Sequence, residues 1–190
     1  MTSSKTYSFT LFLAGVDVLG DENLDALYEA GCDDAVFGER DGAQYAAFDR
    51  DATSFRQALR SAIANLTAAV SGLEVVRIAP EDLVTLAAIA DRSGLSREYV
   101  RLLANQERGP GGFPPPVGYA DHKTRLWHWA DVAEWLQNHK KSKVQLDTEG
   151  ADLVLAMNAA LSYQRHARHL PKADLALVAE VLGDNPFVHS

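Results

Sequence analysis

The segment from residue 86 to 103, LAAIADRSGLSREYVRLL, constrains the fold most, because its apolar residues and its glycine have the spacing of two short helices joined by a tight turn. We expect the first helix over residues 86–91, the turn at Gly94, and a second helix capped by Ser96. The positions that fit the buried and turn sites of a helix-turn-helix are Ile89, Ala90, Gly94, Leu95, Val100 and Leu103. The pattern predicts a helix-turn-helix, with a purely structural helical hairpin as the alternative.

The outer face of the second helix is predicted to contact DNA. The side chains expected on it are Arg97, Glu98, Arg101, Leu102 and Asn105. Arg97 and Arg101 lie four residues apart, and a guanidinium fork matches the O6 and N7 acceptors of guanine. Ser96 stands where a helix N-terminus favours a phosphate. In the alternative interpretation, the two arginines only solvate the helix surface or pair with Glu98.

The charges of the chain are unevenly distributed. The net charge is −8, but residues 84–145 hold nine basic and six acidic side chains, whereas residues 1–83 hold six basic and fourteen acidic ones. The only basic segment therefore contains the helix-turn-helix, and an acidic remainder would repel DNA elsewhere on the surface. Lys140, Lys141 and Lys143 are expected to contact phosphates without base preference, or to form an ordinary polar linker.

The first 80 residues predict the order βαββαβ. We expect strands over residues 7–16, 34–38, 44–48 and 73–78, and helices over 22–30 and 54–71, with Leu24, Leu27 and Tyr28 on one face of the first helix. Asp41-Gly42 between two apolar runs indicates a hairpin. This order is that of a ferredoxin-like sandwich. An RNA-recognition fold is a weaker alternative, because only Tyr45 and Phe48 of the third strand offer aromatic rings within an acidic domain.

The residues after the helix-turn-helix predict a β hairpin and three further helices. The Gly- and Pro-rich run 108–117 cannot be helical, so we expect an extended segment that leads to a hairpin of residues 117–119 and 125–127. A helix over 129–139 should bury Val132, Trp135 and Leu136. Helices over 149–166 and 172–182, separated by Pro171, are too short to form a core alone and should pack on another domain or on a second subunit.

These elements predict an α+β chain of three parts. Residues 1–80 form a ferredoxin-like accessory or dimerisation domain, residues 81–143 a winged helix-turn-helix, and residues 144–190 a helical hairpin. Cys32 is the only cysteine, which favours a reducing cytoplasm, and its acidic neighbours make it a poor nucleophile. No carboxylate stands at ligand spacing from His166 and His169. We therefore expect neither catalysis, a cofactor nor a metal site, and no membrane-spanning segment.

The segment from Thr85 to Leu136 resembles the winged helix-turn-helix of MerR-type regulators and of excisionase-type (AlpA-like) phage and plasmid proteins. The helix-turn-helix, the run FPPPV at 113–117 and the run RLWHWADVAEWL at 125–136 carry this resemblance. It implies that Arg125 lies in a wing strand and, with Lys123, reaches a phosphate or the minor groove. The first domain resembles an accessory domain that precedes such motifs in bacterial proteins. Unlike in a MerR activator, the helix-turn-helix does not come first, so effector-responsive activation is not implied.

The sequence thus predicts a bacterial DNA-binding transcriptional regulator, a repressor that binds double-stranded DNA as a homodimer. An antitoxin or phage-derived interaction module is the alternative. Such a module would regulate its own gene through the helix-turn-helix and bind a protein partner through the C-terminal helices. The residues expected to contact DNA are Ser96, Arg97, Glu98, Arg101, Asn105, Lys123, Arg125, Lys140 and Lys141.

Overall fold

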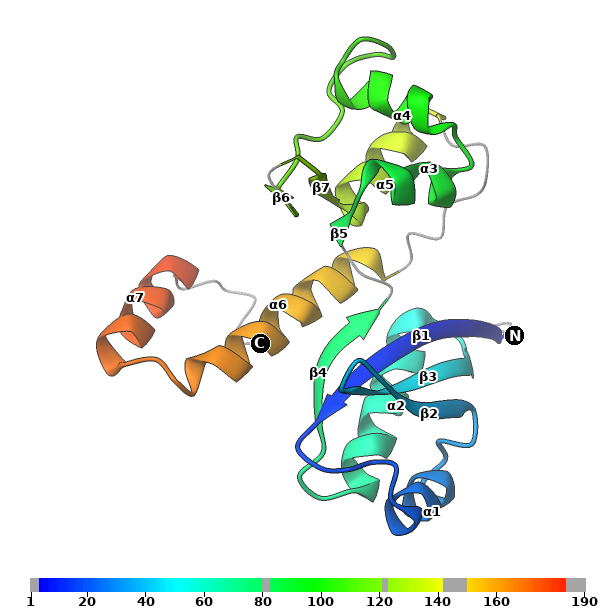
Figure 1. The fold of residues 1–190 in the computed structure, drawn as a ribbon, viewed down its shortest axis with the longest axis vertical. Coiled ribbons are helices and arrows are strands. Elements are labelled where there is room, and N and C mark those ends of the chain that lie inside the picture. Colours follow the sequence, from blue (N-terminus) through cyan, green and yellow to red (C-terminus); the bar gives the residue numbers. More distant parts are fainter. Residues whose placement is uncertain (1–3, 80–82, 121–122, 142–149, 184–190) are drawn as a thin grey trace.

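The computed structural model describes residues 4–79, 83–120, 123–141 and 150–183. The fold is mixed α+β, with two antiparallel sheets that belong to separate hydrophobic cores. Figure 1 shows two lobes, one containing β1–β4 and the other containing α3–α5, with α6 running between them.

The first lobe is a four-stranded sheet with two helices on one face. Its elements are β1 (Lys5–Ala14), α1 (Asp21–Glu29), β2 (Ala35–Arg40), β3 (Ala43–Ala52), α2 (Phe55–Ala69) and β4 (Glu74–Ala79). The strand order is β2-β3-β1-β4, and each neighbouring pair is antiparallel. Alternate residues of β1 face α1 and α2, so that Phe9, Leu11 and Leu13 are buried. Phe9 stacks on Phe48 of β3 and meets Phe55 of α2 edge to face.

The second lobe packs three helices against a small sheet. Its elements are β5 (Leu83–Val84), α3 (Leu86–Ser93), α4 (Arg97–Ala104), β6 (Gly118–Tyr119), β7 (Arg125–His128) and α5 (Trp129–Asn138). The β6–β7 hairpin pairs Gly118 with Leu126 and Tyr119 with Arg125, which confirms the predicted pairing. All three tryptophans of the chain are buried in this core, with Phe113 between Trp127 and Trp135. The burial of Trp135 confirms the expectation for α5, and Trp127 and Trp129 belong to the same core.

Helix α6 (Ala151–Ala167) covers the outer edge of the first sheet. The Asn158 side-chain amide accepts a hydrogen bond from the Ile78 N–H at 2.8 Å and donates one to the Ile78 C=O at 3.0 Å, so it takes the place of a neighbouring strand along β4. Val154 is buried in the first core, whereas Ala151 packs against the second. Gly150 comes so close to the Phe55 ring that any side chain would collide with it.

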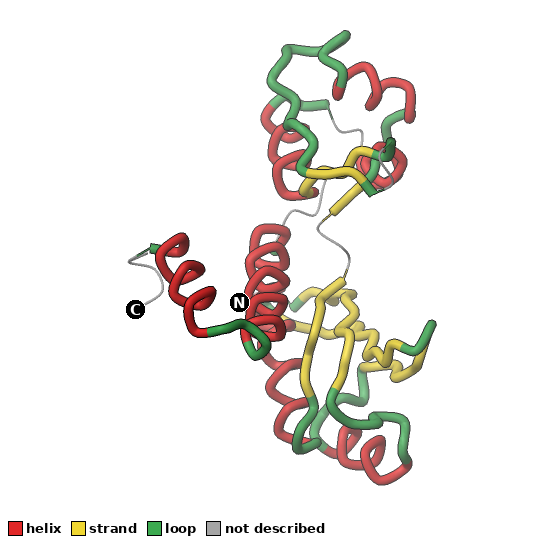
Figure 2. The backbone as a smooth tube through the Cα atoms, turned by 60° about the vertical axis from the view of Figure 1, so that its left-hand side comes forward, coloured by secondary structure: helices red, strands yellow, loops and turns green. Residues whose placement is uncertain are grey.

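Helix α7 (Lys172–Leu182) follows Pro171 and buries none of its residues. Its exposed apolar side chains are Leu177, Val181 and Leu182. Figure 2 shows α7 standing away from both lobes. The expectation that the C-terminal helices pack on another domain or on a second subunit is therefore confirmed for α6, which packs on the first lobe, whereas α7 packs on neither lobe and its contact with a second subunit stays a prediction.

Several local expectations are corrected by the structure. Tyr28 is 68% exposed and does not share the buried face of Leu27. Phe48 is buried under the helices, three residues from Tyr45, so the two rings lie on opposite faces of β3. The two-residue strand β5 was not foreseen, because a run this short has no periodicity. Residues 80–82, at the predicted boundary between the first two parts of the chain, and Glu149, the expected start of a helix, lie outside the described residues.

A candidate nucleic-acid interface

Helices α3 and α4 meet at the turn that the sequence predicts. Thr85 and Ser96 cap the two helices by accepting hydrogen bonds from the Ala88 and Tyr99 N–H groups. Gly94 adopts a left-handed conformation with φ of 68°, as this turn requires. The apolar residues expected to be buried are all at most 9% exposed: Ile89, Ala90, Leu95, Val100 and Leu103. Helix α3 extends to Ser93, two residues beyond its expected end, and the Ser93 hydroxyl donates to the Ile89 C=O.

The two arginines predicted on the outer face of α4 differ in their contacts. Arg97 is exposed and forms no ion pair within the part of the chain that the structure describes. Arg101, four residues later, donates from Nε and Nη2 to the two carboxylate oxygens of Glu98, at 2.9 and 2.8 Å. The alternative expectation of pairing with Glu98 is therefore what the structure shows for Arg101.

Glu107, beyond the end of α4, is a second partner of Arg101. Its carboxylate accepts from Nη1 at 3.3 Å and from the Asn105 amide at 2.8 Å. The hydrogen bond from Arg101 lowers the pKa of Glu98, and those from Asn105 and then Arg101 lower the pKa of Glu107. The same contacts, with Glu98 first, raise the pKa of Arg101. All three groups are therefore fixed in their charged forms at neutral pH.

The β6–β7 hairpin is joined to the same face by Arg125. Its Nη2 donates to Asn105 Oδ1 at 3.0 Å, and its guanidinium lies 5.2 Å from the centre of the Trp127 ring. Lys123 is exposed on the connection between the two strands. The hairpin thus brings Arg125 to the end of α4 that carries Asn105.

A surface depression of about 570 Å³ lies along the opposite flank of α4. It is lined by Leu95, Ser96, Glu98, Tyr99, Leu102, Arg108, Lys140 and Lys141. Lys140 ends α5 in a left-handed conformation, and the Lys141 N–H donates to the Leu136 C=O at 2.9 Å. The backbone of these two lysines therefore forms the cap that follows α5. Ser142 and Lys143 lie outside the described residues.

The structure thus brings the predicted DNA-contacting residues to one helix and its two flanks. Asn105 and Arg125 lie at one flank, and Ser96, Lys140 and Lys141 at the other, whereas Lys123 is exposed two residues before Arg125. Sequence reasoning missed Glu107 and Arg108, which reach α4 because Gln106 turns the chain with φ of 60° and the Glu107 N–H returns to the Leu102 C=O. The only sequence signal for this turn was the Gly- and Pro-rich run 108–117, which shows that the helix must end shortly after Asn105.

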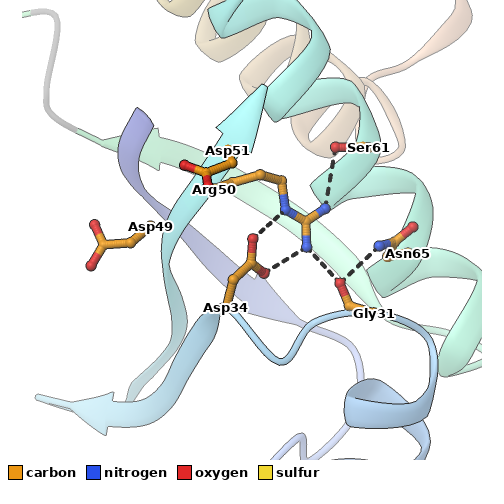
Figure 3. Close-up of a pocket in the computed structure, with 7 residues that line it drawn as sticks. All are labelled: Gly31, Asp34, Asp49, Arg50, Asp51, Ser61 and Asn65. Atoms are coloured by element: carbon orange, nitrogen blue, oxygen red, sulfur yellow. Dashed lines mark hydrogen bonds and ion pairs between the residues drawn. The ribbon is translucent and has the colours of Figure 1, made fainter. Parts of the chain in front are cut away.

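The first lobe has a second polar cluster, around Arg50 of β3 (Figure 3). Arg50 is 6% exposed and donates to both oxygens of Asp34 at 2.7 Å, to the Gly31 C=O and to the Ser61 hydroxyl. This cluster joins the loop after α1 to β3 and α2, and four of the five guanidinium N–H groups are occupied. A cavity of about 390 Å³ borders it. The alternation of Ala46, Phe48, Arg50 and Ala52 in the sequence was the signal that Arg50 faces inward.

No group of three or more His, Cys, Asp or Glu side chains among the described residues is placed to hold a metal ion. Within the same residues, every helix is too short or too polar to cross a membrane. No protein-family model, characterised protein or solved structure matches this chain.

Proposed function

We propose that this chain is a sequence-specific bacterial DNA-binding regulator, a repressor that acts as a dimer without catalysing a reaction. In this proposal, α3, α4, the β6–β7 hairpin and α5 form a winged helix-turn-helix, and the first lobe is a ferredoxin-like accessory domain. Its strand order β2-β3-β1-β4, with both helices on one face, supports the second assignment.

The observation that carries the proposal is the set of charges around α4. The helix is short and anchored by Val100 and Leu103, and its exposed face is bordered by cations on both sides. Arg125 lies at one border, and Arg108, Lys140 and Lys141 at the other. A helix that enters the major groove has a phosphate backbone on each side, so this arrangement complements a duplex.

Each group then has a distinct task. Arg97 points outward from the first turn of α4, where a recognition helix contacts base edges. The lysines at the end of α5 and the Ser96 end of α4 contact one phosphate backbone, and Lys123 contacts the other. Because one eight-residue helix spans only a few base pairs, two half-sites and hence two copies of the chain are needed for useful specificity. Occupancy of an operator would then block transcription.

The test is selection of bound fragments from bacterial genomic DNA, repeated with Arg97→Ala and Lys141→Ala. Loss of a bidentate base contact costs about 1–3 kcal/mol, so Arg97→Ala should weaken the preferred sequence and change which sequence is preferred. Lys141→Ala should weaken all duplexes alike and reduce the salt dependence. Lys172→Ala, at the start of α7, is the matched control and should change neither. Wild-type protein that retards no fragment at low salt would refute the proposal.

Helix α7 favours a second candidate function, an antitoxin or phage-derived module that binds a partner protein. Leu177, Val181 and Leu182 are 59–79% exposed, and apolar side chains grouped in this way are typical of an interaction surface. The structure shows where to truncate the chain. Deletion of residues 171–190 removes α7 and retains α6, whose Asn158 covers the edge of β4.

Co-purification of the full chain and of this truncated chain from the native host separates the two candidates. A neighbouring gene product that is retained by the full chain and lost on truncation supports the interaction module. If no other protein is retained and the full chain dimerises while the truncated chain does not, α7 mediates self-association, which supports the dimeric repressor.

A further inference from the structure

Arg101 is held by two carboxylates on the face of α4 that would meet DNA. Glu98 accepts from Nε and Nη2, and Glu107 accepts from Nη1 at 3.3 Å and from Nη2 at 3.5 Å. Four of the five guanidinium N–H groups are thereby engaged. Arg101 therefore cannot bind guanine with two hydrogen bonds unless it first leaves these partners.

The same network includes the β6–β7 hairpin. The Asn105 side chain donates from Nδ2 to Glu107 and accepts at Oδ1 from Arg125, so one amide connects the carboxylate to the wing arginine. The network contains two arginines and two glutamates and has no net charge. This network, Arg125 included, is thus neutral as a whole, while Arg97, Arg108, Lys140 and Lys141 lie outside it.

We propose that Glu98 and Glu107 determine the sequence specificity of binding. Arg101 leaves the two carboxylates only for a base whose hydrogen-bond acceptors take their place. This inference rests on the proposed DNA-binding function. Phosphates occur along every duplex, and an unpaired arginine would bind any of them. A guanine presents O6 and N7 together and so offers Arg101 the two parallel acceptors that Glu98 offers, whereas a phosphate that reaches Arg101 comes close to the carboxylates of Glu98 and Glu107. The carboxylates weaken binding to the wrong sequence more than binding to the right one.

Glu107→Gln is the test variant, because Glu107 lies outside α4 and a glutamine has nearly the same size as a glutamate. Glu98 is less suitable, since an acid in the first turn also stabilises the helix. The matched control is Glu134→Gln, an exposed acid on α5 of the same lobe, which changes the net charge by the same amount. Dissociation constants are measured at one salt concentration for the best duplex from the genomic selection and for a scrambled duplex of equal composition.

Glu107→Gln should tighten binding to the scrambled duplex about two- to fivefold, the scale of an exposed ion pair, with a smaller gain on the selected duplex. The ratio of the two constants should therefore fall. Glu134→Gln should leave this ratio unchanged. An unchanged ratio in Glu107→Gln, or an equal fall in the control, would overturn the inference while leaving the DNA-binding function intact. A wild-type protein that prefers no duplex would instead overturn the proposed function.

Discussion

Replacement of Leu103 by alanine should destabilise the second lobe without removing any group predicted to contact DNA. Leu103 lies on the hidden side of α4, where it is 1% exposed. Its Cδ2 is 2.8 Å from the position that a Cβ on Gly109 would take, so the chain that follows α4 packs directly on this side chain. With neighbours on both sides, the cavity cannot close by a small shift of one element.

The expected cost of Leu103→Ala is about 2–5 kcal/mol, the range for a fully buried leucine. Unfolding free energies of small domains lie near the lower end of about 5–15 kcal/mol, so the variant keeps only part of the stability of this lobe. With a urea dependence of roughly 2 kcal/mol per molar, the unfolding midpoint should fall by about 1–2.5 M.

Tryptophan fluorescence is the assay for the second lobe, because Trp127, Trp129 and Trp135 are the only tryptophans of the chain and all lie in its core. The control is Leu66→Ala, which empties an equally buried site in α2 of the first lobe. Leu103→Ala should lower the fluorescence midpoint, whereas Leu66→Ala should lower only the circular dichroism midpoint. Equal shifts of the fluorescence midpoint in both variants would refute the reasoning that the two cores unfold independently.

Three further predictions follow from contacts outside α4. Asn158→Ala removes both hydrogen bonds to the backbone of Ile78 and should lower the free energy of unfolding of the first lobe by about 1–3 kcal/mol. Circular dichroism in urea measures this change. A cost below about 0.5 kcal/mol would mean that water replaces the amide. Burial raises the pKa of the Cys32 thiol above its ordinary value of 9.0, so the unfolded chain loses this proton first. Stability from this thiol should therefore be complete below about pH 8.5 and fall at higher pH, and Cys32→Ala should flatten that fall in urea titrations. Val181→Asp should weaken self-association measured by sedimentation, and an unchanged dimer would place the contact away from α7.

The sequence predicted the elements of the two lobes well, because most of their signals are local. The spacing of Ile89, Val100 and Leu103 fixes the buried sides of two helices, and Asp41-Gly42 fixes a hairpin, without knowledge of the rest of the chain. Tyr28 shows the limit of such reasoning. Helical spacing states which residues share a face, but only the position of a neighbouring element decides which part of that face is covered.

The polar contacts of the candidate interface could not be predicted in the same way. Pairing of Arg101 with Glu98 follows from their spacing of three residues, but the contact with Glu107 depends on the left-handed turn at Gln106. The depression beside α4 depends on the packing of α5, which brings Lys140 and Lys141 opposite Tyr99. Both features are produced by the path of the chain between elements, for which residue spacing carries no information.

In the proposed DNA-binding function, the distribution of charge around α4 would separate affinity from specificity. Arg108, Lys140 and Lys141 lie at one border, where counterion release would strengthen binding to any duplex. The central network of Glu98, Arg101, Asn105, Glu107 and Arg125 is neutral as a whole and releases few ions. Added salt should therefore weaken binding to selected and scrambled duplexes with similar slopes and leave the ratio of their dissociation constants nearly constant. If the ratio fell steeply with salt, the centre of the interface would have to act by net charge, and the neutral network could not be the source of specificity.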